Sequence, residues 1–237
     1  VVEFRQLVMA LHKAGLRVGM DVVYNHTTTS GQKDSSVLDR IVPGYYQRLD
    51  ANGVVERSTC CDNTATEHLM MGKLMLDSVE LWARQYRIDS FRFDLMGHQP
   101  RAAMELLRTR VNASTGRDVN LIGEGWNFGE VADGRRFVQA SQLSLNGSGI
   151  GTFSDRTRDA VRGGGPSDSG QALVEQQGYI NGLVYDRNEY APERPLVDLM
   201  QAADLVRVGL AGSLRDFRLD TYQGATSRLD AIDYKGQ

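Results

Sequence analysis

The stretch Tyr86-Arg87-Ile88-Asp89-Ser90-Phe91-Arg92-Phe93-Asp94 decides the fold class of this chain. It is a short apolar run that ends in an acidic residue, and side chains in a strand alternate between the two faces of a sheet. A strand here would point Phe91 and Phe93 to one face, and Arg92 and Asp94 to the other. We expect the two aromatic rings to pack beneath helices. The Arg92 guanidinium would lie within reach of the Asp94 carboxylate and favour its ionised form.

Two further stretches end in the same acidic and polar way. They are Val18-Gly19-Met20-Asp21-Val22-Val23-Tyr24-Asn25-His26 and Asn120-Leu121-Ile122-Gly123-Glu124-Gly125-Trp126. Strand interiors rarely contain charges without a partner. Three strand-like segments with ionisable ends are therefore hard to explain by packing alone.

Segments of helical period separate these strands. Apolar residues recur at helical spacing in four ranges, 4–11, 70–86, 103–111 and 199–210. Alternating strands and helices predict an α/β fold with a parallel sheet covered by helices. In such sheets ligands bind beyond the carboxyl ends of the strands, where Asp21, Asp94 and Glu124 all lie. Only about four strands are visible, so an eight-stranded barrel would be roughly half present.

Residues 27–69 show no sustained period, and a connection of this length is usually functional. We expect it to be a long loop on the substrate side of the sheet. It contains the two cysteines, Cys60 and Cys61, which are adjacent and lack a zinc-motif spacing. Because a bridge between neighbouring residues would be strained, we expect two free thiols.

The composition excludes several kinds of partner. Hydrophobic residues make up 41% and charged residues 24%, which is ordinary for a globular protein. The net charge is −3 and the basic residues are scattered, so we expect no nucleic-acid partner. No apolar run approaches the roughly 20 residues that span a bilayer, so we expect no membrane partner. The sequence does not specify a cellular compartment.

The two carboxyl groups at 94 and 124 suggest a division of labour. Glu124 lies between two glycines and beside Trp126, with no obvious cation nearby, so it would hold its proton more readily and act as a general acid. Asp94, ionised beside Arg92, would act as a nucleophile. Glycoside hydrolysis needs one carboxyl group of each kind. Trp126 could then stack on a sugar face, while Asn25 and His26 could hydrogen-bond to its hydroxyl groups.

Each of these residues also has an ordinary structural interpretation. Arg92 and Asp94 could be a structural ion pair, Asp21 a turn residue, His26 a structural histidine and Trp126 a core residue. The roles of the other histidines stay open: His12, His68 and His98. The coincidence of several such features at equivalent strand ends favours a site.

Two other classes of function fit parts of the pattern. Acidic residues that end successive barrel strands could bind Mg²⁺ and stabilise an enolate. Such a site needs a Lys or His base, no lysine lies near these strand ends, and Arg92 would compete with the cation. A non-catalytic carbohydrate-binding barrel is the other alternative, although it has no need to keep Asp94, Glu124 and Arg92 together.

Three stretches of the chain resemble conserved regions of the α-amylase family of glycoside hydrolases: Asp21-Val22-Val23-Tyr24-Asn25-His26, Phe91-Arg92-Phe93-Asp94 and Gly123-Glu124-Gly125-Trp126. Three others are similar to the pullulanase and limit-dextrinase branch of that family: Cys60-Cys61-Asp62-Asn63-Thr64-Ala65, Phe93-Asp94-Leu95-Met96-Gly97-His98 and Gly151-Thr152-Phe153-Ser154-Asp155-Arg156. That branch cleaves the α-1,6 branch links of α-glucans.

The resemblance implies a fold and a reaction. The chain would hold about the third to sixth strands of a (β/α)8 barrel, with their helices and the long loop 27–69 after the third strand. Asp94 would be the nucleophile, Glu124 the acid/base and Arg92 the partner of Asp94. The implied reaction is retaining hydrolysis of α-1,6 links in pullulan, branched dextrins, starch or glycogen, through a covalent glycosyl-enzyme intermediate. An α-1,4 hydrolase or a transferase of the same family is the alternative.

The resemblance also implies how the glucan is bound. Asp21, Asn25 and His26 would support or contact the sugar at the cleavage point, and Trp126 would lie on the aglycone side. No cofactor is expected. Structural calcium occurs in parts of the family, but no acidic loop here has a calcium-ligand spacing.

One family region is absent from the sequence. The His-Asp pair of the fourth conserved region, whose Asp binds the distorted sugar, is expected beyond Gln237. The chain begins in a helical pattern at Val1, and residues 229–237 have no cap-like composition. We therefore expect residues 1–237 to be an incomplete catalytic barrel domain, truncated at both ends and inactive by itself.

Overall fold

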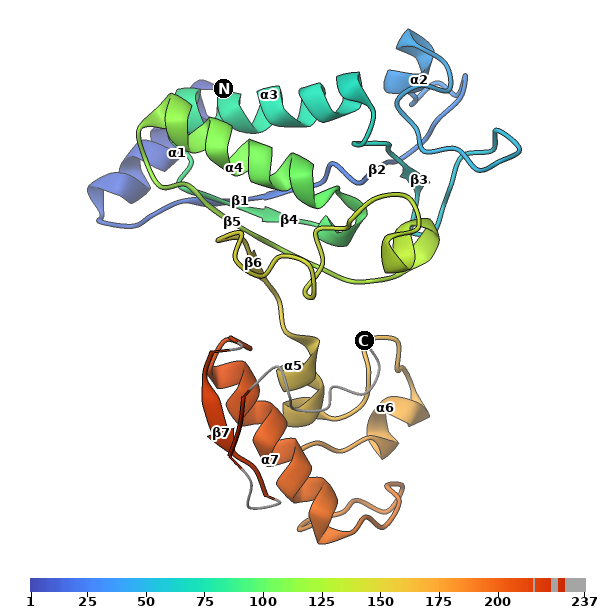
Figure 1. Cartoon of the computed structure of the whole chain (residues 1–237), viewed down its shortest axis with the longest axis vertical. Coiled ribbons are helices and arrows are strands. Elements are labelled where there is room, and N and C mark those ends of the chain that lie inside the picture. The colour runs from blue at the N-terminus through green and yellow to red at the C-terminus, as the bar shows by residue number, and fades with distance from the viewer. Residues whose placement is uncertain (215, 223–225, 229–237) are drawn as a thin grey trace. The chain divides into compact units, whose positions relative to one another are not determined.

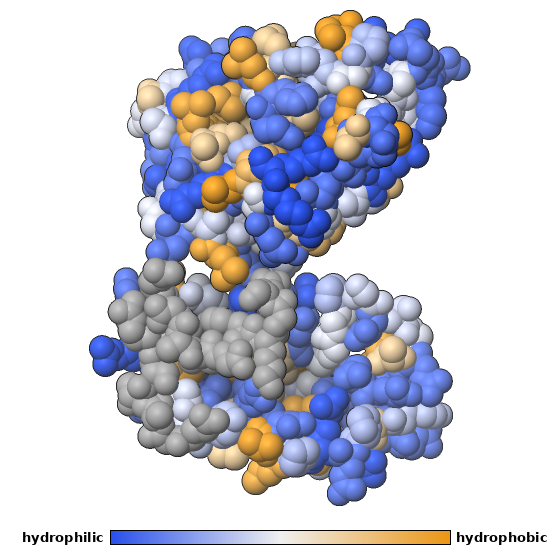
Figure 2. All heavy atoms as spheres, turned by 45° about the vertical axis from the view of Figure 1, so that its right-hand side comes forward, coloured by the Kyte–Doolittle hydropathy of each residue, from blue (hydrophilic) through white to orange (hydrophobic). Residues whose placement is uncertain are grey.

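The computed structural model describes residues 1–214, 216–222 and 226–228. The chain divides into two compact units, residues 1–153 and 154–237. Among the described residues, no helix has both the length and the apolar character that a membrane span requires. On the face seen in Figure 2, hydrophobic residues lie in scattered patches between hydrophilic ones.

A parallel sheet of four strands lies at the centre of the first unit. Its order is β1 (Gly19–Val22), β4 (Ser90–Phe93), β5 (Asn120–Gly123) and β6 (Gly151–Thr152), and every neighbouring pair is parallel. This confirms the predicted α/β fold with a parallel sheet.

Helices precede and connect these strands at the predicted positions (Figure 1). They are α1 (Val2–Lys13), α3 (Leu69–Gln85) and α4 (Arg101–Thr115), with α3 and α4 packed together over one face of the sheet. Pro100 precedes α4, and Gly116 ends that helix at a φ of 64°, a left-handed conformation that glycine adopts without steric cost.

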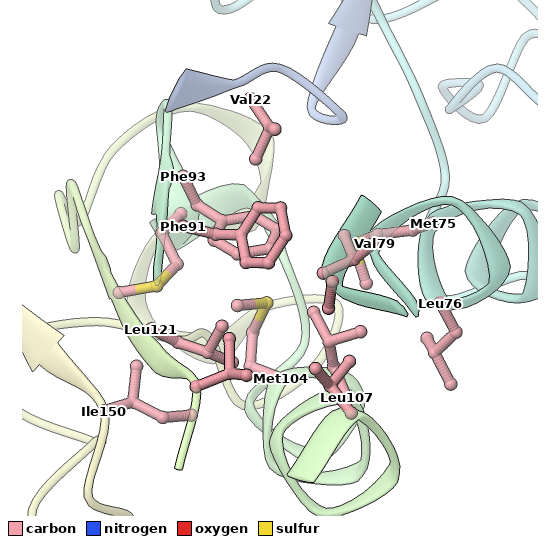
Figure 3. Close-up of a cluster of buried hydrophobic side chains, with 14 of the residues drawn as sticks. Val22, Met75, Leu76, Val79, Phe91, Phe93, Met104, Leu107, Leu121 and Ile150 are labelled. Carbon is pink, nitrogen blue, oxygen red and sulfur yellow. The ribbon is translucent and has the colours of Figure 1, made fainter. Parts of the chain in front are cut away.

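The core of this unit lies between the sheet and its helices. Phe91 and Phe93 are fully buried, and their rings point towards Met75 and Val79 of α3, with Met104 of α4 close by (Figure 3). The alternation predicted from the sequence is therefore confirmed: the aromatic residues of β4 pack beneath the helices, and the opposite face of the strand is left for Arg92.

The long connection 27–69 contains short elements that its sequence did not predict. Strand β2 (His26–Thr27) pairs antiparallel with β3 (Asp62–Asn63), and α2 (Leu38–Ile41) lies between them. Two-residue strands are too short to show a period of two, which explains why the pattern did not reveal them. Two 3-10 helices follow the main strands, η1 (Met96–His98) and η2 (Gly129–Gly134).

The turn that carries Cys60 and Cys61 differs from the expectation for these two cysteines. Cys60 and Cys61 are joined by a disulfide, so the prediction of free thiols is wrong. Thr59 Oγ1 donates to Asn63 Oδ1 at 2.6 Å and accepts from the Cys61 N–H at 3.3 Å. These hydrogen bonds fold the chain into a turn that sets the two sulfur atoms together, which adjacency in sequence alone could not show.

The second unit contains α5 (Asp155–Arg162), α6 (Gln171–Glu175), α7 (Leu196–Leu210) and a hairpin of β7 (Arg218–Asp220) and β8 (Thr226–Arg228). Helices α5 and α7 pack on each other, and they approach so closely that a Cβ atom on Gly209 would overlap Thr157. The predicted helix at 199–210 is confirmed by α7. The expectation about residues 229–237 lies outside the described residues.

Candidate active site

One guanidinium brings three of the predicted acidic residues together. The register of the sheet sets Asp21 of β1 beside Arg92 of β4. Arg92 Nη1 donates to Asp21 Oδ1 at 2.9 Å and to Asp94 Oδ1 at 3.2 Å, while Nη2 lies 2.7 Å from Glu124 Oε1. The carboxylates therefore share one face of the sheet at its carboxyl edge, as the sequence predicted.

The backbone fixes Asp94 and Glu124 one residue beyond their strands. The Asp94 N–H donates to the carbonyl of Val22 at 3.0 Å, and the Glu124 N–H donates to the carbonyl of Phe93 at 3.1 Å. Glu124 Oε2 accepts a second hydrogen bond from the Leu95 N–H at 2.9 Å. Leu95 has a φ of 39°, so the chain turns sharply after Asp94 and aims its amide at Glu124.

The contact between Arg92 and Glu124 corrects one expectation. The sequence pattern indicates no cation near Glu124, yet Glu124 Oε1 forms an ion pair with Arg92. In the sheet, Arg92 is level with Ile122, two residues before Glu124. The long arginine side chain spans that diagonal, and the separation of 32 positions along the sequence hid the pairing.

The electrostatic environment keeps Arg92 charged. Burial opposes its charge, but the hydrogen bond to Asp21 and the negative charges of Glu124 and Asp21 outweigh this effect and raise the pKa of Arg92. The Phe153 ring covers the guanidinium at 5.6 Å from its centroid, a cation–π contact. A cation placed among these carboxylates would have to displace Arg92, which argues against the Mg²⁺ alternative.

Phe153 is a site residue that the sequence analysis missed. It follows β6 directly, as Asp94 follows β4 and Glu124 follows β5. Its N–H donates to the carbonyl of Gly123 at 3.1 Å. Its position directly after a strand, equivalent to the positions of Asp94 and Glu124, could have indicated a site residue. An apolar residue at a strand end is a weaker indication of a site than a charged residue.

Asn25 and His26 lie at the start of the long connection. Asn25 is buried, and its side-chain amide lies 2.9 Å from His26 Nδ1. His26 is partly exposed and lines a hollow of about 450 Å³ together with Thr27, Thr29 and Leu38. Asp94 and Glu124 are not among the residues that line this hollow.

Trp126 is half-buried, and the turn that carries it packs against the turn after β4. The Gly97 N–H donates to the carbonyl of Glu124 at 2.9 Å, and a Cβ atom on Gly97 would overlap the Trp126 carbonyl oxygen. The close approach of the two turns explains why glycine is needed at position 97. The stacking role of Trp126 stays a prediction.

A buried ionic network that the sequence pattern did not predict is centred on Arg48. Arg48, only 1% exposed, forms a two-bond ion pair with Glu67 at 2.9 and 2.8 Å and donates to Glu130 Oε1 at 2.8 Å. It also donates to the carbonyl of His98 at 3.0 Å. Burial opposes the charge of Glu130, but hydrogen bonds from Ser58 and Arg48 hold its pKa at about 2. The network ties the connection 27–69 to the turns after β4 and β5.

The remaining histidines have local partners. His12 Nε2 lies 2.8 Å from Asp89 Oδ2, and His68 Nδ1 lies 2.7 Å from the Tyr45 carbonyl oxygen. His98 is 1% exposed and stacks on Phe128 with ring centroids 4.7 Å apart. Burial lowers the pKa of His98 to about 4.

The chain is similar to known proteins over nearly its whole length. No family model matches it. It is 48% identical over 239 aligned residues to the pullulanase of Klebsiella aerogenes, covering 99% of this chain and 21% of that protein. It is 44% identical over 235 residues to the chloroplastic pullulanase 1 of Arabidopsis thaliana, covering 94% of this chain and 24% of the relative.

Solved structures agree with the sequence relatives. The maltotriose complex of the Klebsiella pneumoniae pullulanase superposes with a TM-score of 0.92 at 48% identity, covering 99% of this chain and 25% of that chain. The chain is an α/β protein with paired carboxylates beyond the ends of its parallel strands. Over nearly its whole length it is homologous to pullulanases. It spans 21% of the length of the Klebsiella aerogenes relative.

Proposed function

We propose that the chain carries the catalytic carboxylates of a retaining hydrolase of α-1,6-glucosidic branch links in pullulan, branched dextrins, starch or glycogen. The observation that carries the proposal is the contact of Arg92 with both Asp94 and Glu124, on a segment 48% identical to a pullulanase. A relative in Pectobacterium carotovorum, 32% identical over 167 residues, is a glycogen debranching enzyme.

The proposed reaction has two steps. Asp94 attacks the anomeric carbon while Glu124 gives its proton to the glycosidic oxygen, so that the leaving glucan departs with a hydroxyl group. In the second step Glu124 takes a proton from water, which attacks the same carbon and releases Asp94. Arg92 balances the charge of both carboxylates. Asp21, Asn25, His26 and Trp126 hold the sugar on either side of the scissile bond.

The proposal extends to the architecture. Residues 1–237 would form one part of a (β/α)8 barrel, about its third to sixth strands, with 27–69 as the substrate-side loop. The four parallel strands and the coverage of only 21% of the Klebsiella aerogenes pullulanase support this. No cofactor takes part in the proposed reaction.

A chimera provides the test. Residues 1–237 replace the matching segment of the Klebsiella aerogenes pullulanase, and the release of reducing ends from pullulan is measured. Asp94→Asn and Glu124→Gln should each lower kcat by roughly 10²- to 10⁴-fold, the typical contribution of such groups. Asp118→Asn is the matched control, because this carboxylate is 73% exposed at the start of β5 and away from the cluster. Retained turnover in Asp94→Asn would overturn the proposed role of that residue.

Ligand binding gives a second readout. The relative of known structure binds maltotriose, and we propose that this chain takes the same class of α-glucan oligosaccharide. Calorimetry of maltotriose with the Asp94→Asn chimera should give an affinity close to that of the parent chimera, because the amide keeps the shape of the carboxylate. Loss of binding together with activity would indicate a misfolded site.

A further inference from the structure

We propose that Cys60, Cys61 and His26, once the disulfide is reduced, form a binding site for a thiophilic divalent cation such as Zn²⁺. The two sulfur atoms and a ring nitrogen of His26 lie within 4.8 Å of one another. Over the ranges that the structure describes, this is the one group of three or more His, Cys, Asp or Glu side chains close enough to share a metal ion. Thiolate and imidazole are the ligands that zinc prefers.

Two segments of the chain hold the three ligands: strand β2 carries His26, and the turn before β3 carries the two cysteines. His26 begins β2, which pairs with Asn63 of β3, and Asn63 is bonded to the turn that carries the cysteines. This brings Cys60 Sγ to 3.5 Å from His26 Nε2. The third ligand comes from 34 positions away, so the spacing of the cysteines alone could not indicate a metal site.

Asn25 can prepare the imidazole for a metal ion. Asn25 Nδ2 faces His26 Nδ1 at 2.9 Å, and among the described residues its buried Oδ1 has no hydrogen-bond partner. A half-turn of the amide would exchange Nδ2 and Oδ1, and Oδ1 would then accept a hydrogen bond from Nδ1–H. The lone pair of the histidine then lies on Nε2, the nitrogen that faces Cys60. Metal-binding histidines are usually oriented by such an acceptor on their second nitrogen.

A dithiol can reduce the disulfide and so prepare the two cysteines to bind zinc, with electrons and protons in balance. The dithiol gives two electrons and two protons to the Cys60–Cys61 bond and becomes a disulfide itself, leaving two thiols. Zn²⁺ then replaces the two thiol protons, since thiolates are the metal-binding form. Cys60 is exposed and Cys61 is partly exposed, so both the reductant and the cation can reach them. The fourth tetrahedral position is left for water.

Zinc at this site would inhibit glucan hydrolysis, and this consequence rests on the proposed function. His26 is assigned to the sugar at the cleavage point, and a metal ion on its Nε2 withdraws that nitrogen from a hydroxyl group. The oxidised chain leaves His26 available. The pair of cysteines would thus make the activity sensitive to zinc only under reducing conditions.

A direct metal titration tests the site. The full 237-residue chain is reduced with a phosphine, freed of reductant, and titrated with Zn²⁺ against a chromophoric chelator; Co²⁺ serves as a spectroscopic probe. We expect one Zn²⁺ per reduced chain, a thiolate-to-cobalt charge-transfer band, and neither signal in the oxidised chain. His26→Gln should weaken zinc binding by roughly tenfold or more, whereas the control His12→Gln should leave it unchanged.

A variant that lacks both cysteines tests whether they are the zinc ligands. The double variant Cys60→Ser, Cys61→Ser should lose both the zinc affinity and the cobalt band. Equal zinc affinity in wild type and double variant would overturn the proposal, as would a cobalt spectrum without the charge-transfer band. If the double variant does not fold by circular dichroism, alkylation of the reduced wild-type chain takes its place. Zinc binding that survives alkylation would also overturn the proposal.

Activity measurements distinguish a failure of the proposed zinc site from a failure of the proposed hydrolase function. In the reduced chimera, saturating Zn²⁺ should lower the rate on pullulan at least tenfold, and the rate of the double cysteine variant should not respond to Zn²⁺. Unchanged rates with zinc bound would overturn the inhibition and the sugar contact of His26. A chimera inactive in every redox state would overturn the proposed function, whereas the zinc titration of the chain would still decide the metal site.

Discussion

Arg92 Nη2 and Glu124 Oε1 lie 2.7 Å apart, the shortest of the contacts between Arg92 and its three carboxylates. The other oxygen of Glu124 accepts a hydrogen bond from the Leu95 N–H at 2.9 Å. Both oxygens of the proposed proton donor are therefore occupied by donors. Protonation of Glu124 removes the charge that attracts Arg92 and weakens this contact, so binding of the substrate and rearrangement at Arg92 should be coupled.

The first prediction concerns the geometry of that arginine. Arg92→Lys keeps the charge but replaces a planar fork by a single ammonium, which cannot reach Asp21, Asp94 and Glu124 together. Losing charge-assisted hydrogen bonds worth about 1.5–3 kcal/mol should lower kcat of the chimera by roughly 10- to 100-fold. Steady-state kinetics on pullulan measure this. Arg84→Lys, on an exposed helix pair with Glu80, is the control and should leave kcat unchanged.

The second prediction concerns stereochemistry. If Asp94 is a nucleophile, its carboxyl group and that of Glu124 should lie about 5–5.5 Å apart in the substrate complex, and the product should keep its anomeric configuration. Proton NMR of the first product formed by the chimera distinguishes the two anomers before they equilibrate. Net inversion would mean that water attacks directly and that Asp94 acts as a base.

The sheet and the carboxylate cluster were predictable because they follow from period and position. Alternation in β4 separates Phe91 and Phe93 from Arg92, and parallel strands end at the same edge, so Asp94 and Glu124 had to meet there. These inferences need only local sequence and the general geometry of α/β folds.

Contacts made by long side chains across unrelated segments could not be predicted in this way. Arg48 and Glu130 are 82 positions apart, and no shared period or strand pairing aligns one with the other. His26 and Cys60 likewise belong to separate segments, and the Arg92–Glu124 contact depends on the register between two strands. No property of the individual residues predicts such side-chain contacts.

The third prediction is a pH dependence of stability that comes from His98. Burial lowers the pKa of this side chain to about 4 from the usual value of 6.5. Between these values the unfolded chain binds the extra proton and the folded chain does not, so stability is fully present above pH 6.5 and is lost as the pH falls towards 4. The loss should amount to about 3 kcal/mol.

Urea unfolding of the chain at several pH values between 4 and 7 measures this loss. His98→Gln should remove most of the slope in that window, because glutamine does not titrate. Glu130, with a lowered pKa of about 2, contributes its own loss only below about pH 4.5 and does so in both chains. An identical slope in the variant would show that His98 is not the responsible group.

The fourth prediction tests the network around Arg48. Arg48→Met keeps much of the side-chain volume but leaves the carboxylates of Glu67 and Glu130 without their partner. Removing one member of a buried ion pair costs about 3–5 kcal/mol, since the remaining charge stays desolvated. Lys73→Met removes an exposed ion pair with Asp77 and should cost at most about 1 kcal/mol. Urea unfolding compares both variants with wild type. Equal losses of stability in the two variants would mean that water reaches the carboxylates around Arg48 in the folded chain.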